Sequence, residues 1–326
     1  MQLFSTLFRI GSLILIHYLP NLNFSIIKPH ARIWFIIICC LNTQSCSTST
    51  MLRTSPNTVE MIMMKRSESI LDNGSIPDRP EKSLKHCIIL TQTAFGFIME
   101  NAERELDEDY KQGLTLYAEA NKYFTRAVVL GENYMFLRYP WFDEWLNNSP
   151  DKHIKFGNDD VEGLYWLAAA YGGAVSSSRG EPEWVIQLPK VGKLLDNALA
   201  IDPNWNYGSL YSAMIPYSLS RPDAPVNASE VAEGYYRKAL VASDGKDLGL
   251  HVSFAENVLI ARQNRSEFVR LLTLVLESNH RGIKELEVGN YMAKKRAQWL
   301  LGRTEAVSYT HLRAHETSLH IVCRLL

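Results

Sequence analysis

The stretch NALAIDPNWNYGSLYSAM, residues 197–214, shows the pattern that decides the fold. One apolar segment ends near Ala198, the chain turns at Asp202-Pro203, and a segment with aromatic residues follows. The stretch RKALVASDGKDLGLHVSFAENVL, residues 237–259, repeats this order around Ala239. A small residue near the end of one helix, then a turn and an aromatic-bearing helix, is typical of tetratricopeptide-type repeats. The two stretches therefore predict paired helices.

The same helical spacing of apolar residues extends over the rest of the body, and no segment alternates as a strand does. We expect an all-α fold, a tetratricopeptide-like helical-repeat solenoid of about nine helices. Gly131 is expected to end one of them, because glycine is common just past a helix. Ala198 and Ala239 lie 41 residues apart, against about 34 in a regular repeat, so a generic helical bundle remains the alternative. The nine expected segments are 83–106, 113–131, 159–177, 182–203, 207–220, 229–243, 248–263, 266–278 and 292–303.

Composition and motifs exclude several classes of function. The chain has 326 residues, a formal net charge of −1 and 46% hydrophobic residues, so no excess of basic residues points to nucleic acid. No apolar run reaches the roughly 18 residues of a membrane span. No P-loop, GxGxxG, GxSxG or HExxH motif occurs, and the acidic run Asp107–Asp109 is best explained by solvation or a helix N-cap. We therefore expect that the protein is not an enzyme and that it binds neither a cofactor nor a metal.

The N-terminal region, residues 1–45, is interpreted as an export signal. Basic residues precede the apolar run IWFIIICCL, residues 33–41, and small polar residues follow it. Cys46 then suits lipoprotein processing, in which the new N-terminal cysteine is acylated. Thr43 is not the residue that such a signal prefers, so a cleaved signal or an uncleaved anchor with an incidental Cys46 is the alternative. Residues 1–27 lengthen the signal beyond the usual range, and an over-extended start would explain them.

Two regions follow the signal. Residues 46–80 are rich in Ser, Thr, Asn, Pro and Gly and are interpreted as a tether with a short helix. Residues 81–305 are expected to form the helical-repeat domain.

Six aromatic residues are candidates for a ligand or partner groove: Tyr139, Trp141, Phe142, Trp145, Tyr165 and Trp166. The first four lie within seven residues beside Pro140 and acidic groups, a composition found at interfaces. The alternative is a loop folded onto the helices. Tyr165 and Trp166 share one expected helix, where they either fill the core between helices or line a pore.

The blocks GLYWLAAAYGGAVS (163–176), LPKVGKLLDNALAIDPNWNYGSLYSAM (188–214), YYRKALVASDGKDLGLHVSFAENVLIARQNRSEFVRLL (235–272) and AKKRAQWLLGRTE (293–305) occur in this order. As an ordered set they resemble the TRAP transporter TatT component family, bacterial extracytoplasmic lipoproteins of tetratricopeptide-like fold. The resemblance covers about residues 84–305. It does not extend to the segment RYPWFDEWLNNSPDKHIKFG, residues 138–157.

The resemblance implies a non-enzymatic partner of a periplasmic TRAP-type substrate-binding protein that assists ligand uptake. It also implies a homotrimer with a ligand-passing pore. Cys46 would carry the lipid, and Ser47 after it would favour sorting to the outer membrane, on the periplasmic side of the envelope. The alternative function is a generic tetratricopeptide scaffold for assembly of envelope proteins.

The C-terminal stretch VSYTHLRAHETSLHIVCRLL, residues 307–326, places His311 and His315 four residues apart, as a helical zinc site would. However, VSYTHLRAHET back-translates into the transposase-end and adapter sequence of short-read libraries. We therefore interpret residues 306–326 as adapter read-through and exclude them from the fold. A genuine C-terminal helix with a metal pair is the alternative, and a native stop codon shortly after Glu305 would exclude it.

Overall fold

The computed structural model describes residues 56–279 and 283–304, which belong to one compact unit of the chain. The export signal, Cys46 and residues 306–326 lie outside this part. Its elements before residue 178 are α4 (Pro56–Asn73), α5 (Pro80–Thr93), the π-helix η4 (Ala94–Met99), α6 (Glu100–Glu108), α7 (Tyr110–Arg138), α8 (Phe142–Leu146), the 3-10 helix η5 (Asn158–Asp160) and α9 (Val161–Ser177). The elements after residue 178 are α10 (Pro182–Val185), α11 (Leu188–Ile201), α12 (Trp205–Ser220), α13 (Ala228–Ala242), α14 (Leu248–Phe254), the π-helix η6 (Ala255–Leu259), α15 (Arg265–Glu277) and α16 (Lys284–Gly302).

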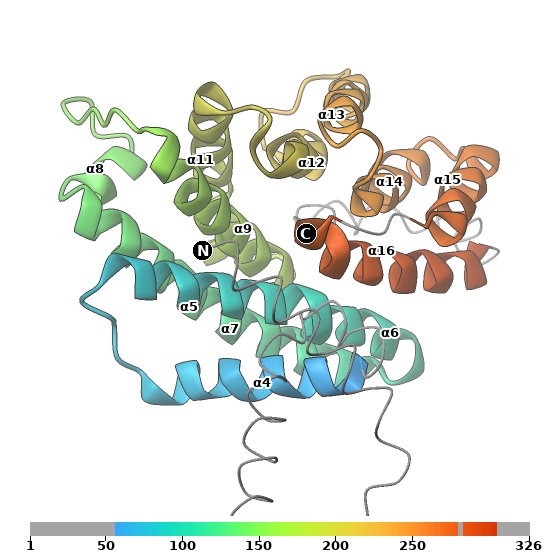
Figure 1. The fold of residues 1–326 in the computed structure, drawn as a ribbon, viewed down its shortest axis with the longest axis horizontal. Helices are drawn as coiled ribbons and strands as arrows, with labels where there is room; N and C mark the ends of the chain where they lie inside the picture. The colour runs from blue at the N-terminus through green and yellow to red at the C-terminus, as the bar shows by residue number, and fades with distance from the viewer. Residues whose placement is uncertain (1–55, 280–282, 305–326) are drawn as a thin grey trace, which may run out of the picture. The chain divides into compact units, whose positions relative to one another are not determined.

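The all-α prediction is confirmed, and each of the nine expected segments is helical (Figure 1). Asp109 caps α7 as expected, because its side chain accepts a hydrogen bond from the Gln112 N–H. Three details differ. Gly131 does not end a helix, since α7 continues to Arg138. The region expected to hold a short helix contains the 18-residue α4, and α8 forms where no helix was expected.

The larger of two apolar cores is built around α9. Every residue of α9 except Glu162 is buried, since α5, α7 and α11 all pack against it. Its glycines allow this close packing, and Gly131 of α7 does the same from the opposite side, near Leu167 and Cys87. Cys87 is fully buried, and its Sγ lies 3.9 Å from the carbonyl oxygen of Trp166.

A second apolar core joins α12 through α16. α12 and α13 make the most extensive helix pair in the unit. The pair depends on a left-handed turn at the start of α12, where Asn206, Tyr207 and Gly208 have positive φ angles. A side chain at Gly208 would meet the methyl group of Ala242 at 2.7 Å, so glycine serves both the turn and the contact. α16 then packs on α14 and α15, and it lies beside α6 of the first core (Figure 1).

Candidate functional site

The aromatic segment after α7 folds onto the helices through ring contacts. Phe142 and Trp145 are 1% and 7% exposed. The rings of Tyr139 and Trp145 meet Phe156 edge-on, at centroid distances of 5.2 and 4.9 Å. These contacts hold the short α8 against the body, although five residues would not form a stable helix alone.

Buried Asp160 fixes the end of this segment. It is 1% exposed and accepts hydrogen bonds from the Tyr139 hydroxyl (2.6 Å) and the Arg138 Nε (2.9 Å). Burial, followed by the hydrogen bond to Asp160, raises the pKa of Tyr139 to about 12. The Tyr139 hydroxyl is therefore a fixed donor in this contact.

Trp141 differs from its neighbours because it is 57% exposed. The Nζ of Lys152 lies 3.7 Å from its ring centroid, close enough for a cation–π contact. Phe136 and Leu137, at the end of α7, are 53% and 41% exposed. We call Phe136, Leu137 and Trp141 the apolar edge. Exposed aromatic and apolar groups of this kind are typical of contact surfaces.

Tyr165 and Trp166 lie inside the body. They are 3% and 7% exposed, and the Tyr165 ring is 4.9 Å from that of Trp205 in α12. Of the six candidate residues, four are thus buried, Tyr139 is half-buried and Trp141 is exposed. That these six residues contact a ligand or a partner stays a prediction. Among them, Trp141 is the one whose side chain is exposed for such a contact.

Asp247 lies near Tyr165 and caps α14, where its carboxylate accepts from the Gly249 N–H at 2.9 Å. Burial raises the pKa of Asp247 above its ordinary value, although hydrogen bonds from backbone N–H groups act against this shift. The charged form is thus disfavoured in the folded state. Asp247 therefore stabilises the start of α14 as its N-cap, but desolvation of its charged carboxylate destabilises the folded state.

We expect Asp247→Asn to raise the free energy of unfolding near neutral pH by a fraction of a kcal/mol, because the amide oxygen keeps the cap and removes the charge. Protonation of Asp247 relieves the same penalty in the parent. The gain should therefore shrink as the pH falls through the raised folded-state pKa. Urea unfolding of both proteins between neutral and acid pH measures this. Asp109→Asn, at an exposed cap, is the control, and an equal gain there would contradict the explanation.

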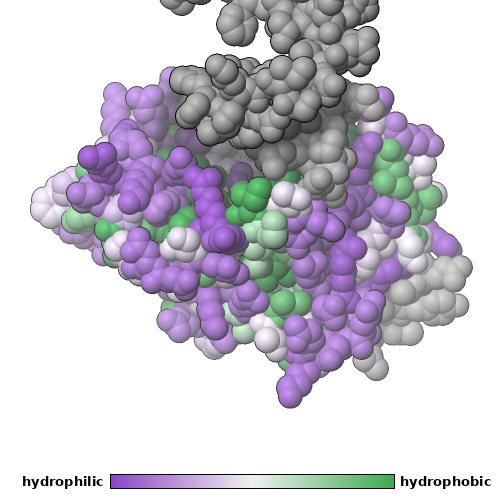
Figure 2. All heavy atoms as spheres, turned by 60° about the horizontal axis from the view of Figure 1, so that its bottom comes forward, coloured by the Kyte–Doolittle hydropathy of each residue, from purple (hydrophilic) through white to green (hydrophobic). Residues whose placement is uncertain are grey.

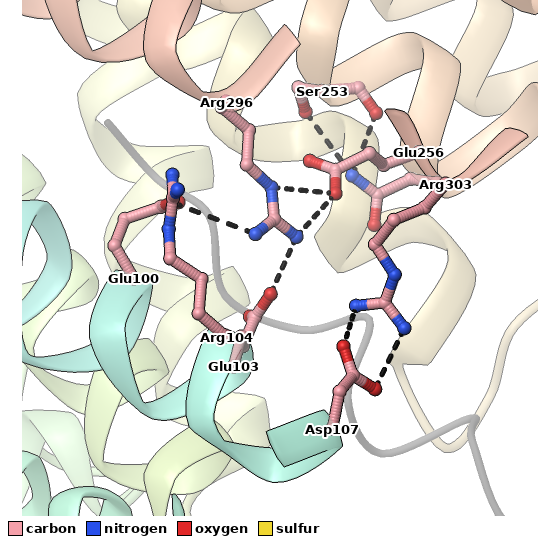
Figure 3. A network of polar contacts seen from close by, with 9 residues as sticks. Glu100, Glu103, Arg104, Asp107, Ser253, Glu256, Arg296 and Arg303 are labelled. Atoms are coloured by element: carbon pink, nitrogen blue, oxygen red, sulfur yellow. Dashed lines mark hydrogen bonds and ion pairs between the residues drawn. The ribbon is translucent and has the colours of Figure 1, made fainter. Parts of the chain in front are cut away.

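A charged cluster connects the two cores (Figure 3). We define it as Arg296 of α16 with Glu100 and Glu103 of α6 and Glu256 of η6. Arg296 is 5% exposed. Its Nη2 lies 2.5 Å from Glu103 Oε2 and 2.7 Å from Glu256 Oε1, and its Nη1 lies 3.6 Å from Glu100 Oε2. One guanidinium thus faces three carboxylates from two other elements.

A second pair extends the same contact. Arg303, at the end of α16, forms an ion pair and a hydrogen bond with Asp107 of α6. Two guanidinium groups contact the ring of Trp299, with Arg296 at 4.2 Å and Arg303 at 4.4 Å from its centroid. Stacked guanidinium groups keep their N–H donors free for carboxylates. Charged side chains therefore make the contact between α6 and α16.

Both π-helical turns adjoin this cluster. η4 ends immediately before Glu100, and η6 contains Glu256. A π turn inserts one residue into an α-helix and rotates the later part of that helix, and such turns are frequent at functional sites. The sequence could not show this site, since Glu100, Glu256 and Arg296 are far apart in the chain. The available signal was Arg296 itself, a charged residue among apolar positions of its helix.

Two further properties concern metal sites and membrane spans. In residues 56–279 and 283–304, no three His, Cys, Asp or Glu side chains are placed to hold a metal ion. Among the helices described for the chain, none is both long and apolar enough to cross a membrane. The fold and these sites define an all-helical protein with an internal charged contact and an exposed apolar edge.

The chain belongs to the TRAP transporter T-component family, whose profile matches residues 78–307, more than half of the chain. This family consists of TRAP transporter components and is not a known enzyme family. The chain is also 18% identical over 212 residues to an uncharacterized protein of Treponema pallidum (strain Nichols). That similarity covers 64% of this chain and 66% of the relative, just under two thirds of the relative's length.

Proposed function

We propose that this protein docks a TRAP-type substrate-binding protein on the periplasmic side of the cell envelope and assists ligand uptake. A lipid on Cys46 would tether it to the outer membrane, and a homotrimer would form the working unit. The observation that carries the proposal is the match of the T-component profile to residues 78–307. The exposed apolar edge supports it by offering a surface for the partner.

Co-elution tests the docking. The detergent-solubilised chain and a TRAP-type substrate-binding protein from the same organism are mixed at micromolar concentration and separated by size. We expect one complex that contains both proteins. Separate elution would exclude docking and leave the generic scaffold as the better explanation.

The apolar edge gives a sharper form of this test. We expect Trp141→Ala to weaken docking about tenfold, because truncation of an exposed aromatic residue at an interface centre costs more than 1 kcal/mol. Binding isotherms of the parent and the variant measure the change. Ile186→Ala and Val241→Ala truncate side chains that are 70% and 82% exposed elsewhere. If all three variants bind equally, the partner does not use the apolar edge.

A further inference from the structure

The helix α4 packs on the body with one side only. Val59, Ser67 and Ile70 are buried, and the Ser67 hydroxyl lies 2.7 Å from that of Thr93 in α5. On other sides of the same helix Met61 is 62% exposed and Ile62 is 46% exposed. α4 runs along the lower side of Figure 1, and Figure 2 turns that side forward, where hydrophobic side chains lie among hydrophilic ones.

Basic side chains lie next to this exposed part of α4. Arg66 follows Ile62 by one helical turn, and both are exposed. Exposed Lys82 and Lys85 lie on the first turns of α5, close enough to Arg66 that all three act on the same group, the half-buried imidazole of His86. α4 and α5 pack directly on each other. Two apolar and three basic side chains are thus exposed on one helix pair, and the three basic ones act on the same imidazole.

The pKa shifts of His86 and Tyr123 show which charges lie near each side of the layer formed by α4 and α5. Desolvation, then Lys82, Arg66, Arg126 and Lys85, lower the pKa of His86, so cations dominate its surroundings. Three carboxylates of α4 and α7 act on another group, Tyr123. Glu68 and Asp72 of α4, together with Glu119 of α7, act on buried Tyr123, whose pKa is raised to about 12 by burial first and by these charges next. The charges that act on His86 are therefore all positive, although Glu81 of α5 and acidic residues of α4 belong to the same helix pair.

We propose that the surface formed by Met61, Ile62, Arg66, Lys82 and Lys85 rests on an anionic lipid surface. Apolar side chains enter the headgroup region while basic side chains contact lipid phosphates, the combination that binds proteins to membrane surfaces.

The proposal rests on the proposed function in one respect, the tether at Cys46. Pro56 lies ten positions after Cys46, and an extended chain of that length reaches at most about 35 Å. A lipid on Cys46 would thus keep α4 near the membrane, and this surface would be the second attachment that a lipid anchor needs.

Vesicle flotation tests the surface without the lipid. The full chain with Cys46→Ala is mixed with vesicles of phosphatidylethanolamine and phosphatidylglycerol, or of neutral phosphatidylcholine. We expect tighter binding to the anionic vesicles, and a loss of this preference at high salt because salt screens phosphate contacts. Residues 1–55 otherwise stay the same in every variant, so their own contribution cancels in each comparison.

Two sets of variants locate the contact. Arg66→Ser/Lys82→Ser/Lys85→Ser should lower partition onto anionic vesicles about tenfold or more. The control Lys111→Ser/Lys155→Ser/Lys238→Ser makes the same change in net charge at other exposed positions and should bind like the parent. Met61→Ser/Ile62→Ser should lower binding to both kinds of vesicle, whereas Ile186→Ser/Val241→Ser should not.

Equal binding to the two kinds of vesicle, or equal losses in the basic set and its control, would overturn the proposal. Docking is read out separately with the same variants. A basic-set variant that still co-elutes with the substrate-binding protein but no longer floats identifies a lipid contact. A parent chain that floats on anionic vesicles but does not co-elute would instead contradict the proposed function alone.

Discussion

Arg296→Met is expected to lower the free energy of unfolding by about 3–5 kcal/mol, the usual result of removing one partner from a buried ion pair. Methionine fills a similar volume but leaves Glu103 and Glu256 facing each other without a guanidinium. Urea unfolding followed by circular dichroism measures the change. Since unfolding free energies are commonly about 5–15 kcal/mol, the variant would lose a large fraction of its stability.

Two further substitutions show whether the charge of Arg296 is the cause of this loss. Arg296→Lys should lose less, because it keeps the charge and gives up only the forked geometry. Arg237→Met removes a cation from an exposed pair with Glu233 and should change stability little. A loss below about 1 kcal/mol in Arg296→Met would mean that the charged cluster does not hold the two cores together.

Gly173→Ala is expected to destabilise the fold by about 1–3 kcal/mol, even though alanine is the better helix former. A methyl group on Gly173 would lie 2.2 Å from Cε1 of Phe124 and 2.3 Å from its Cδ1. Phe124 cannot move aside, because it is fully buried and its ring meets that of Phe95 at 4.5 Å. The crossing of α7 and α9 would have to widen.

The matched substitution is Gly289→Ala in α16, where nothing lies within 4 Å of the added methyl group. There we expect stability to rise by roughly 0.5–1 kcal/mol, the ordinary difference between the two residues in a helix. Phe124→Leu should recover part of the loss in a Gly173→Ala background, because a smaller side chain restores space. If Gly173→Ala and Gly289→Ala have the same effect, close packing at α9 is not the constraint.

The helices could be predicted because their apolar residues recur at a local spacing that the core then buries. The prediction that α7 ends at Gly131 was wrong for a related reason. Gly131 looks like a terminator when only its neighbours in sequence are considered, but in space it makes room for Leu167. The helix α8 was missed because its stability comes from ring contacts with Phe156, outside its own five residues. Local pattern therefore predicted elements and missed the contacts that extend or create them.

The candidate sites could likewise be predicted only as far as local sequence pattern reaches. An aromatic-rich segment is visible in sequence, but its pattern does not distinguish buried Phe142 from exposed Trp141. Of the charged cluster, the sequence shows only Arg296 among apolar positions and not its partners, because Arg296 and Glu100 meet where the two cores are in contact. No helical periodicity predicts the π turns at η4 and η6, since the inserted residue depends on what the surrounding helices require.

The burial of Cys87 has a consequence for the proposed function, because the periplasm is an oxidising compartment. Burial raises the pKa of its thiol from 9.0 to about 12, so almost no thiolate exists in the folded state. Oxidants, metals and other thiols react with the thiolate, and they reach Cys87 only when α5 separates from α7 and α9. The residue is thus protected from mixed disulfides for as long as the larger core stays closed. Its modification in a living cell would record how often that core opens.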